Sequence, residues 1–504
     1  MKTERKRFGV LFAALLSVAL LCVLLCAGCG KTEPQSTLPE ATEPAIADGA
    51  ANPVAVTDGA TVSFDPAGLA FSGTVEKGYL DALTAAYGEE NVKVGCLVAP
   101  TEALIGNNVT AENPNAVKLE AGSRQADGNA YRFTCALTGI REKDYEKSYS
   151  AVAYVEVYGK ILRCSTYSAQ RNVISLVKAA DAAYADLSDA ATGAYRYAVT
   201  VGEDTKYSPY TEEQRELLLA YRFPFAFTVM SYNVEAYDIA DNGQWEGRDP
   251  DKALATVLEE APDVVGFQEI NEEWNPKIVA LARDGAYNRL MGGYCEDGFE
   301  KNEILYKASK FTKIEEGTKI YKELGAEMNI DNSENVDMEV DNHGRAFHYA
   351  VLEQKATGKR FLFVNTHLHY GGTGGGHEED DKMRRYQIRV LLAWMAEQAE
   401  TYPDQIVTGD MNSNYTSVQG GLNMKVFTDG GFSMTFQSAE VTGDVGGTLG
   451  VSDRVKREKY VFDYVLVKGN IRTAYYTVID NKTDKDGASY PSDHLPVIAK
   501  VCLR

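Results

Sequence analysis

The stretch Phe361-Leu362-Phe363-Val364-Asn365-Thr366-His367-Leu368-His369 decides the fold of this chain, because it runs from bulky apolar residues straight into a polar cluster. The apolar half is typical of a short strand that is buried on both faces. The polar half begins where such a strand would end. Catalytic and binding residues often lie at that position, on loops that a rigid sheet holds in place.

Four other parts of the chain show the same pairing of an apolar run with a polar cluster. Strand ends in a packed α/β fold can converge on one place, so we expect the clusters to meet. Together they would supply carboxylates, imidazoles and carboxamides, which suit a divalent cation that holds a phosphate ester beside a water. The four clusters are Ser231-Tyr232-Asn233, Gln268-Glu269, Gly409-Asp410-Met411-Asn412 and Ser492-Asp493-His494.

Each cluster also has a simpler interpretation when it is taken alone. Asp410 and Asn412 lie two residues apart, on one side of an extended segment, but an ordinary turn or helix cap would use the same residues. Glu269 at the end of a buried strand needs a partner, and a lysine or arginine would serve as well as a cation. Asp493-His494 before Leu-Pro could cap a turn. The five clusters in combination favour the functional interpretation.

The patterning divides the chain into segments. Residues 1–28 read as a signal peptide and 29–52, rich in Pro, Thr, Glu and Ala, as a tether. Residues 53–190 mix alternating and helical patterns, which predicts a small α+β or β-sandwich-like accessory module. Residues 191–225 form a connector, in which Thr211 and Gln214 predict a capping box. From residue 226 to 504, strands and hairpins alternate with helices, which predicts a mixed sheet fold with helices outside. One of these helices is predicted over Pro250 to Glu260, with proline in its first turn.

The N-terminus carries the targeting signal. Four basic residues precede an apolar stretch from Phe8 to Cys26, and two small residues then lead to Cys29. This order is that of a secretory signal, and it resembles a bacterial lipoprotein signal in which Cys29 is acylated. Cys26 stands where that signal usually has leucine. An uncleaved membrane anchor is the alternative, and both interpretations place the remaining chain outside the cytoplasm.

Charge and cysteine content exclude some classes of protein. A formal net charge of -21 over 504 residues disfavours sequence-independent nucleic-acid binding, which depends on basic patches. Five of the eight cysteines lie beyond the signal, and an odd number cannot pair completely. We therefore expect no disulfide framework, and the cysteine spacing predicts no metal site.

The clusters in their order closely resemble the endonuclease/exonuclease/phosphatase superfamily, which includes deoxyribonucleases, abasic-site endonucleases, sphingomyelinases and inositol-phosphate phosphatases. The resemblance covers Phe227 to Val501 and adds Phe462-Asp463-Tyr464-Val465 to the set. It implies a four-layered β-sandwich flanked by helices and a metal-dependent phosphoric-ester hydrolase. The motifs are specific for the superfamily and only weakly specific for the substrate.

The resemblance also implies roles for single residues. Glu269 looks like the principal metal ligand, with Asn233 and Asp493 nearby, and the implied ion is Mg²⁺, with Mn²⁺ or Ca²⁺ as alternatives. Asp410 and Asn412 look like the pair that positions water and phosphate. His494 looks like the imidazole that contacts phosphate or activates water, and Asp463 its orienting carboxylate. His367 could bind phosphate or protonate the leaving oxygen. Arg345 could clamp the phosphate or be a surface arginine, and we expect His369 to be a packing or surface residue.

The substrate stays open at this stage. A phosphodiesterase or nuclease-like enzyme is the first hypothesis, although no basic stripe interleaved with aromatic residues is present. A sphingomyelinase-like phospholipid hydrolase and an inositol-phosphate hydrolase are alternatives, and a non-catalytic surface-binding lipoprotein is the alternative of another class. The expected partners are the phosphate ester and, through the lipid anchor, the outer face of the membrane; no obligate protein partner is inferred. The acidic stretch 323–341 reads as a solvated loop rather than a second metal site.

Overall fold

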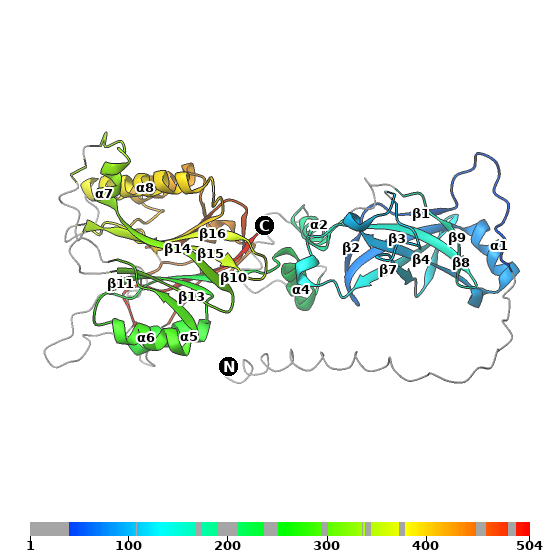
Figure 1. The fold of residues 1–504 in the computed structure, drawn as a ribbon, viewed down its shortest axis with the longest axis horizontal. Coiled ribbons are helices and arrows are strands. Elements are labelled where there is room, and N and C mark those ends of the chain that lie inside the picture. Colours follow the sequence, from blue (N-terminus) through cyan, green and yellow to red (C-terminus); the bar gives the residue numbers. More distant parts are fainter. Residues whose placement is uncertain are drawn as a thin grey trace.

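Two β-sandwiches stand side by side along the long axis of the molecule, and two helices lie between them (Figure 1). The architecture comes from a computed structural model of the chain. The structure describes residues 40–106, 108–167, 174–189, 210–235, 250–293, 301–334, 336–337, 344–371, 378–449, 460–481 and 490–504. No helix among these residues is long and apolar enough to cross a membrane.

The first sandwich forms from residues 54–164 and packs one sheet against another over a shared apolar core. The core contains Leu69, Phe71, Leu80 and Phe133, all buried. One sheet has the path β1 (Val54–Val56), β3 (Ala67–Glu76), β7 (Ala130–Thr138), β6 (Arg124–Asp127), with β2 (Thr61–Phe64) beside β3. The other has the order β5 (Val117–Glu120), β4 (Val92–Pro100), β8 (Tyr149–Val157), β9 (Lys160–Cys164). The β-sandwich form of the predicted accessory module is the one observed.

Short helices complete this part of the chain. α1 (Lys77–Tyr87) packs its apolar residues Tyr79, Leu80 and Leu83 on the core and ends at Gly88, whose φ of 85° suits glycine at a helix end. Three single 3-10 turns occupy Glu89–Asn91, Thr101–Ala103 and Glu142–Asp144.

The two helices at the junction are α2 (Leu176–Asp189) and α4 (Glu212–Arg222). The capping box predicted at the start of α4 is confirmed, because the Thr211 side chain accepts from the Gln214 backbone and the Gln214 side chain accepts in return.

A ring of four charges joins these helices to the second sandwich. Arg222 donates to Asp181 Oδ1 at 2.8 Å and to Glu440 Oε1 at 2.9 Å. Arg472 donates to the same two oxygens at 3.0 and 3.2 Å. The Arg222 guanidinium also lies 3.9 Å from the centre of the Tyr184 ring. Because Arg222 is only 5 % exposed, its charge depends on these partners.

The second sandwich has four layers, as the superfamily resemblance implied (Figure 1). A seven-stranded and a six-stranded sheet face each other across an apolar layer that contains Phe227, Val229, Phe361 and Ile406. The larger sheet has the order β12 (Tyr287–Leu290), β13 (Lys301–Lys307), β11 (Val264–Ile270), β10 (Phe227–Asn233), β22 (Val497–Leu503), β21 (Ile471–Val478), β19 (Val441–Thr442). The smaller has the order β14 (Phe311–Ile320), β15 (Ala346–Gln354), β16 (Arg360–His367), β17 (Gln405–Asp410), β20 (Asp463–Lys468), β18 (Ser433–Met434).

Helices cover the outer faces of both sheets. The helix predicted at Pro250–Glu260 is confirmed as α5, with proline at its first turn, where no backbone donor is lost. α5 and α6 (Asn275–Asp284) cover the seven-stranded sheet, and their buried faces meet Met230, Tyr232 and Phe267. α7 (Tyr321–Glu327), α8 (Glu378–Gln398) and α9 (Val418–Asp429) cover the six-stranded sheet, and α10 (Thr435–Ser438) is a single short turn.

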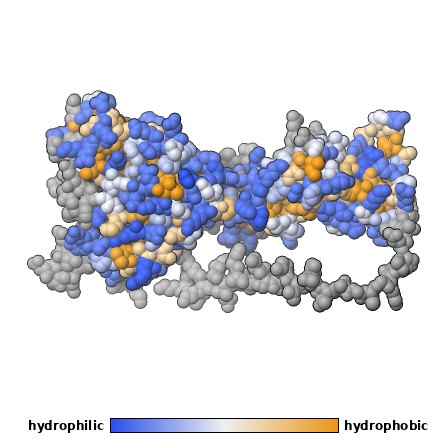
Figure 2. Space-filling view, in the orientation of Figure 1, coloured by the Kyte–Doolittle hydropathy of each residue, from blue (hydrophilic) through white to orange (hydrophobic). Residues whose placement is uncertain are grey.

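The outer surface gives no sign of a large apolar contact area on the face in view. That face is mostly hydrophilic, with apolar residues in small separate patches (Figure 2). The strongly exposed apolar side chains, such as Ile105 at 57 % and Val418 at 82 %, belong to different sandwiches. Scattered exposed apolar residues of this kind are ordinary for a globular protein.

Candidate active site

Three ionisable side chains stand in a row on adjacent strands of the six-stranded sheet. His367 ends β16, Asp410 ends β17 and Asp463 begins β20, and the strand register pairs His367 with Asp410 and Asp410 with Asp463. Residues paired in this way point to the same face of a sheet. All three are at most 2 % exposed, so their charges are interdependent.

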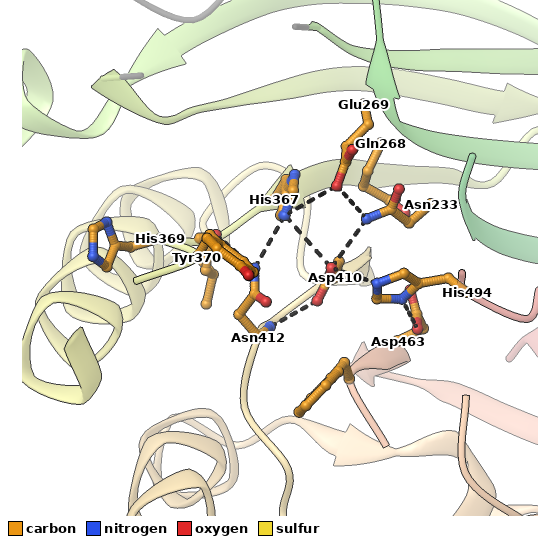
Figure 3. Close-up of polar contacts among 12 residues, drawn as sticks. Asn233, Gln268, Glu269, His367, His369, Tyr370, Asp410, Asn412, Asp463 and His494 are labelled. Atoms are coloured by element: carbon orange, nitrogen blue, oxygen red, sulfur yellow. Dashed lines mark hydrogen bonds and ion pairs between the residues drawn. The ribbon is translucent and has the colours of Figure 1, made fainter. Parts of the chain in front are cut away.

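The seven-stranded sheet contributes Asn233 and Glu269 opposite this row (Figure 3). The amide of Asn233 donates to Glu269 Oε1 at 2.8 Å and to Asp410 Oδ2 at 3.1 Å, so it holds two carboxylates together. Glu269 lies where the pairing of β11 with β13 shifts register, and its φ is 62°. Bulges and left-handed backbone at non-glycine residues are costly and cluster at functional sites, where they redirect a side chain.

His494 precedes β22 and lies over the other end of the row. Its Nδ1 is 2.8 Å from Asp463 Oδ2, and its Nε2 is 3.5 Å from Asp410 Oδ2. Burial alone would lower the pKa of His494, but the carboxylates of Asp463 and Asp410 outweigh it and raise that pKa well above the ordinary value. The turn before His494 is fixed to β10 of the seven-stranded sheet, because Ser492 Oγ donates to the Asn233 carbonyl at 2.8 Å.

His367 has the opposite electrostatic environment. Its Nδ1 lies 2.8 Å from Arg345 Nη1 and its Nε2 lies 3.0 Å from Asn412 Nδ2, so each ring nitrogen faces a hydrogen-bond donor. Burial and the Arg345 charge lower the pKa of His367 to about 4. Its Nε2 lies 3.5 Å from Asp410 Oδ2 and 3.9 Å from Glu269 Oε1. Arg345 is 3 % exposed, so its interpretation as a surface arginine is wrong.

Asn412 brings its carboxamide to the same place from the segment after β17. Its Nδ2 is 3.0 Å from His367 Nε2 and 3.1 Å from the Leu368 carbonyl. Its backbone N–H donates to Asp410 Oδ1 at 2.8 Å, and its φ is 45°. This short left-handed turn keeps Asp410 and Asn412 aimed at one point.

The side chains present suit a hard divalent cation. Two groups have one ligand atom per residue within 4.8 Å of one another: Glu269, His367 and Asp410, and then Asp410, Asp463 and His494. Burial raises the pKa of Asp410, against the opposing pull of the two imidazoles. Asp463 Oδ1 is buried without a hydrogen-bond partner among the residues that the structure describes. Buried carboxylates repel one another when few positive groups lie beside them, and a bound cation would stabilise such a cluster.

Asp493, the third predicted metal ligand, is placed differently. Its backbone N–H donates to Glu235 Oε2 at 3.1 Å. Among the described residues, neither of the two groups above includes it. Its role as a ligand stays a prediction.

A buried layer of hydrogen-bonded side chains lies between the two sheets behind the site. Gln268 Nε2 donates to Asn365 Oδ1 at 2.6 Å, and Thr408 Oγ1 donates to the same oxygen at 3.1 Å. Asn365 Nδ2 donates to the Phe267 carbonyl at 2.6 Å, across the gap between the sheets. The layer approaches the backbone so closely that a Cβ on Gly266 would lie 2.2 Å from Thr408 Oγ1. Sequence patterns flagged Gln268 and Asn365 but gave them no role.

Aromatic side chains lie beside the polar cluster. Tyr370 directly follows His369 and is 57 % exposed (Figure 3). On the other side, the rings of Tyr460 and Phe462 stack with centres 5.8 Å apart, and the Phe462 ring is 6.4 Å from that of His494. No local pattern predicts this arrangement, because Tyr370 lies far along the chain from the neighbouring residues Tyr460 and Phe462.

Two further predictions concern the surroundings of the site. His369 is buried and its Nε2 is 3.2 Å from Asp380 Oδ1, so it packs against α8, as expected for a structural histidine. Within the acidic stretch, Glu334 is bound by Arg385 at 2.8 Å and Arg389 at 2.7 Å of α8. This carboxylate serves packing, and the solvated interpretation is wrong for it. Cys29 and residues 338–343 lie outside the described residues.

Comparison with known proteins agrees with this geometry. Residues 230–494, more than half of the chain, match the Endonuclease/Exonuclease/phosphatase family. A similar curated protein is the CCR4-Not complex 3'-5'-exoribonuclease subunit Ccr4 of Yarrowia lipolytica, which is 26 % identical over 241 residues, or 42 % of this chain. The match spans only 33 % of that relative's own length.

Solved structures with a similar fold come from several organisms. One is a Bacteroides thetaiotaomicron endonuclease/exonuclease/phosphatase family protein, at 21 % identity and a TM-score of 0.44 over 55 % of this chain and 98 % of the other. Another is a mannosyl-6-phosphatase of the same species, with 21 % identity and a TM-score of 0.44 over 55 % and 99 %. The human nocturnin catalytic domain gives 17 % identity and a TM-score of 0.40 over 55 % and 95 %.

The family match begins in β10, ends at His494, and so encloses the whole cluster built above. The chain belongs to the endonuclease/exonuclease/phosphatase family.

Proposed function

We propose that the protein is a cell-surface, Mg²⁺-dependent phosphodiesterase that uses water to cleave nucleic-acid strands. The observation that carries the proposal is the buried row of His367, Asp410 and Asp463, faced by Glu269 and closed by His494. This arrangement concentrates negative charge for a cation at one point. It also places two imidazoles on either side of that point, one with a raised pKa and one with a lowered pKa.

The cation would be held by Glu269, with Asn233 and Asp493 as further oxygen ligands. Mg²⁺ is the first candidate because the set is dominated by carboxylate and amide oxygens, with Mn²⁺ and Ca²⁺ as alternatives. When bound, such a cation neutralises charge on the phosphate and so makes phosphorus open to attack by water.

The protein's own groups then divide the work. Asp410, whose pKa is raised by burial, accepts a proton from a water that the Asn412 carboxamide orients. His494, held as a cation by Asp463, donates to a non-bridging phosphate oxygen. His367 stays neutral, because burial and Arg345 lower its pKa to about 4, and its Nε2 faces the site to assist the leaving oxygen.

Nucleic acid is favoured by the aromatic residues beside the cluster. Tyr370 and the stacked pair Tyr460–Phe462 provide flat surfaces for bases, and stacking contributes about 1–3 kcal/mol per base. Supporting similarity comes from the exoribonuclease relative. The net charge of -21 argues for short single strands, which need no extended basic surface.

The surface location rests on the N-terminal sequence. Basic residues from Lys2 to Arg7, the apolar stretch Phe8–Cys26 and Cys29 follow the order of a lipoprotein signal. Acylated at Cys29 and carried on the tether, the enzyme would act outside the cell.

Hydrolysis of bis-p-nitrophenyl phosphate with Mg²⁺, with and without EDTA, tests the enzymatic proposal. We expect activity that EDTA removes and Mg²⁺ restores, and its loss in His494→Ala. Asp429→Asn, an exposed acid paired with Lys425, is the control and should keep full activity. Activity that survives both EDTA and His494→Ala would refute the assigned site.

A panel of RNA and DNA oligonucleotides, sphingomyelin, inositol phosphates and mannose 6-phosphate tests the substrate. Preferred turnover of oligonucleotides supports the proposal. Preferred turnover of a lipid or of a phosphomonoester would replace it with the matching branch.

Incorporation of labelled fatty acid in a bacterial host tests the anchor. The parent chain should be labelled and reach the cell surface, and Cys29→Ala should be unlabelled. An unlabelled parent chain would refute the lipoprotein proposal without touching the enzymatic one.

A further inference from the structure

Two buried cysteines face each other inside the first sandwich, far from the candidate active site in the chain. Cys96 lies on β4 of the four-stranded sheet and Cys135 on β7 of the five-stranded sheet. They are 0 % and 2 % exposed and belong to one apolar core. Neither is used by the chemistry proposed above.

The hydrogen-bond geometry shows that each sulfur reaches across to the other's strand neighbour. In the sheets, Cys135 pairs with Phe71 and Cys96 pairs with Leu119. Cys96 Sγ lies 3.9 Å from the Phe71 carbonyl, and Cys135 Sγ lies 3.6 Å from the Leu119 carbonyl. This reciprocal arrangement turns the two thiols toward each other across the core that both sheets share.

The strands that carry the two cysteines come close to each other. Packed sheets usually stand about 10 Å apart, whereas a disulfide needs Cα atoms within about 7 Å. Here β5 pairs with β4 and the following strand β6 pairs with β7, so the chain folds over from one sheet to the other. Cα atoms of β4 and β7 come within 8 Å of each other.

We propose that Cys96 and Cys135 are a modification site, which a small-molecule or protein disulfide oxidises to a disulfide bond between the two sheets. The disulfide would cross-link the two sheets near the place where the chain passes from β5 to β6. The other described cysteines are differently placed: Cys164 is half-buried on β9, and Cys502 Sγ contacts the Pro224 carbonyl at 2.9 Å in a separate core.

The two thiols are not equivalent. The interaction of each thiol with the other lowers the pKa of Cys135 and, together with burial, raises that of Cys96 well above its ordinary value. Cys135 therefore attacks the oxidant as the thiolate and expels one thiol, leaving a mixed disulfide. Cys96 then attacks Cys135 Sγ, and the second half of the oxidant leaves as a thiol. Two S–H bonds are lost, one S–S bond forms, and the oxidant carries away both hydrogens and both electrons.

A peptide map of the full chain in detergent tests the proposal. The chain is incubated with oxidised glutathione at a denaturant concentration that partly opens the fold, returned to native buffer, alkylated after denaturation and digested. We expect one linked peptide pair, Cys96 with Cys135, that disappears on reduction. The matched control Cys164→Ser should keep the link, and Cys96→Ala should leave Cys135 alkylated.

Thermal unfolding provides a second readout, since a cross-link restricts the unfolded chain. Dithiothreitol should lower the Tm of the first sandwich by several degrees in the oxidised parent and in Cys164→Ser, and should leave Cys96→Ala unchanged. Alkylated Cys96 and Cys135 after oxidation of the parent would overturn the proposal, as would a link from either to Cys164. The parent map decides the matter even if Cys96→Ala does not fold.

Discussion

The two sandwiches use the same architecture and fill it differently. Between its sheets, the first holds apolar side chains such as Leu69, Phe71 and Phe133. The second holds an apolar layer as well, but at one edge the filling changes to the hydrogen-bonded amides of Gln268 and Asn365. That polar edge is where the site residues gather. The contrast indicates that a functional site can form in this fold where hydrogen-bonded polar side chains replace the apolar core at one edge of the sheets.

The largest effect is expected from Asp410→Asn, which removes a carboxylate but keeps its shape. We expect hydrolysis to fall by about a thousandfold, in line with the loss of a group that contacts the reacting atoms. The Tm should stay equal or rise, because burial already disfavours the charge on Asp410. Activity and circular dichroism melts measure both quantities. A variant that is unfolded as well as inactive would contradict the idea that this residue serves chemistry rather than stability.

Gly266→Ala and Gly95→Ala form a matched pair, one in each sandwich. A new Cβ would lie 2.2 Å from Thr408 Oγ1 in the first case and 2.0 Å from the Leu119 carbonyl in the second. Both should lower the free energy of unfolding by about 1–3 kcal/mol, since a packed core resists extra volume.

Only Gly266→Ala should also lower kcat, by about 10- to 100-fold, because it displaces the amides that support Glu269 and His367. Urea melts and steady-state kinetics separate the two effects. Equal kcat in the two variants would show that the polar layer contributes to packing and does not position the site residues.

His348, a buried histidine of the second sandwich, should make the stability of that sandwich depend on pH. It is buried on β15 beside the polar layer. Its Nδ1 is 3.0 Å from Thr318 Oγ1, and its Nε2 has no hydrogen-bond partner among the described residues. Burial lowers its pKa to about 4, with Glu316 opposing and Lys313 assisting. The unfolded chain binds this proton below pH 6.5 and the folded chain only below about 4.

Stability should therefore fall as the pH drops from 6.5 to 4, by about 3 kcal/mol from this group. His348→Gln should lose that part of the pH dependence, as measured by urea melts at several pH values. Parallel curves for parent and variant would show that His348 is protonated at the same pH in both states.

The smallest effect is expected from Phe462→Leu, which removes a stacking surface and leaves the polar cluster in place. The KM for an RNA oligonucleotide should rise about 5- to 50-fold, since base stacking contributes about 1–3 kcal/mol. The KM for glycerophosphoglycerol, which has no ring, should be unchanged. Equal changes for both substrates would remove the aromatic argument for nucleic acid.

The sequence predicted what depends on neighbouring residues. The fold class, the capping box at Thr211 and the helix that begins at Pro250 follow from local patterns, and all three are confirmed. The gathering of the clusters at strand ends also followed, because short apolar runs mark where strands stop.

What could not be predicted depends on how sheets and helices pack. The burial of Arg345, the binding of Glu334 by α8 and the facing pair Cys96–Cys135 each join segments far apart in sequence. No local pattern sets such distances. The layer around Asn365 belongs here too, since its purpose is visible only when Gly266 of the opposite sheet lies against it.

One consequence of the charge ring concerns which substitutions evolution can accept at its four positions, Asp181, Arg222, Glu440 and Arg472. Each acid bonds both arginines, and Arg222 is buried, so losing any one member leaves a charge in the interior without its full set of partners. Single substitutions at these positions are therefore costly, while joint replacement by apolar residues of similar volume need not be. Across related chains, the four positions should be kept or exchanged as a group, although two of them lie on the junction helices and two in the second sandwich.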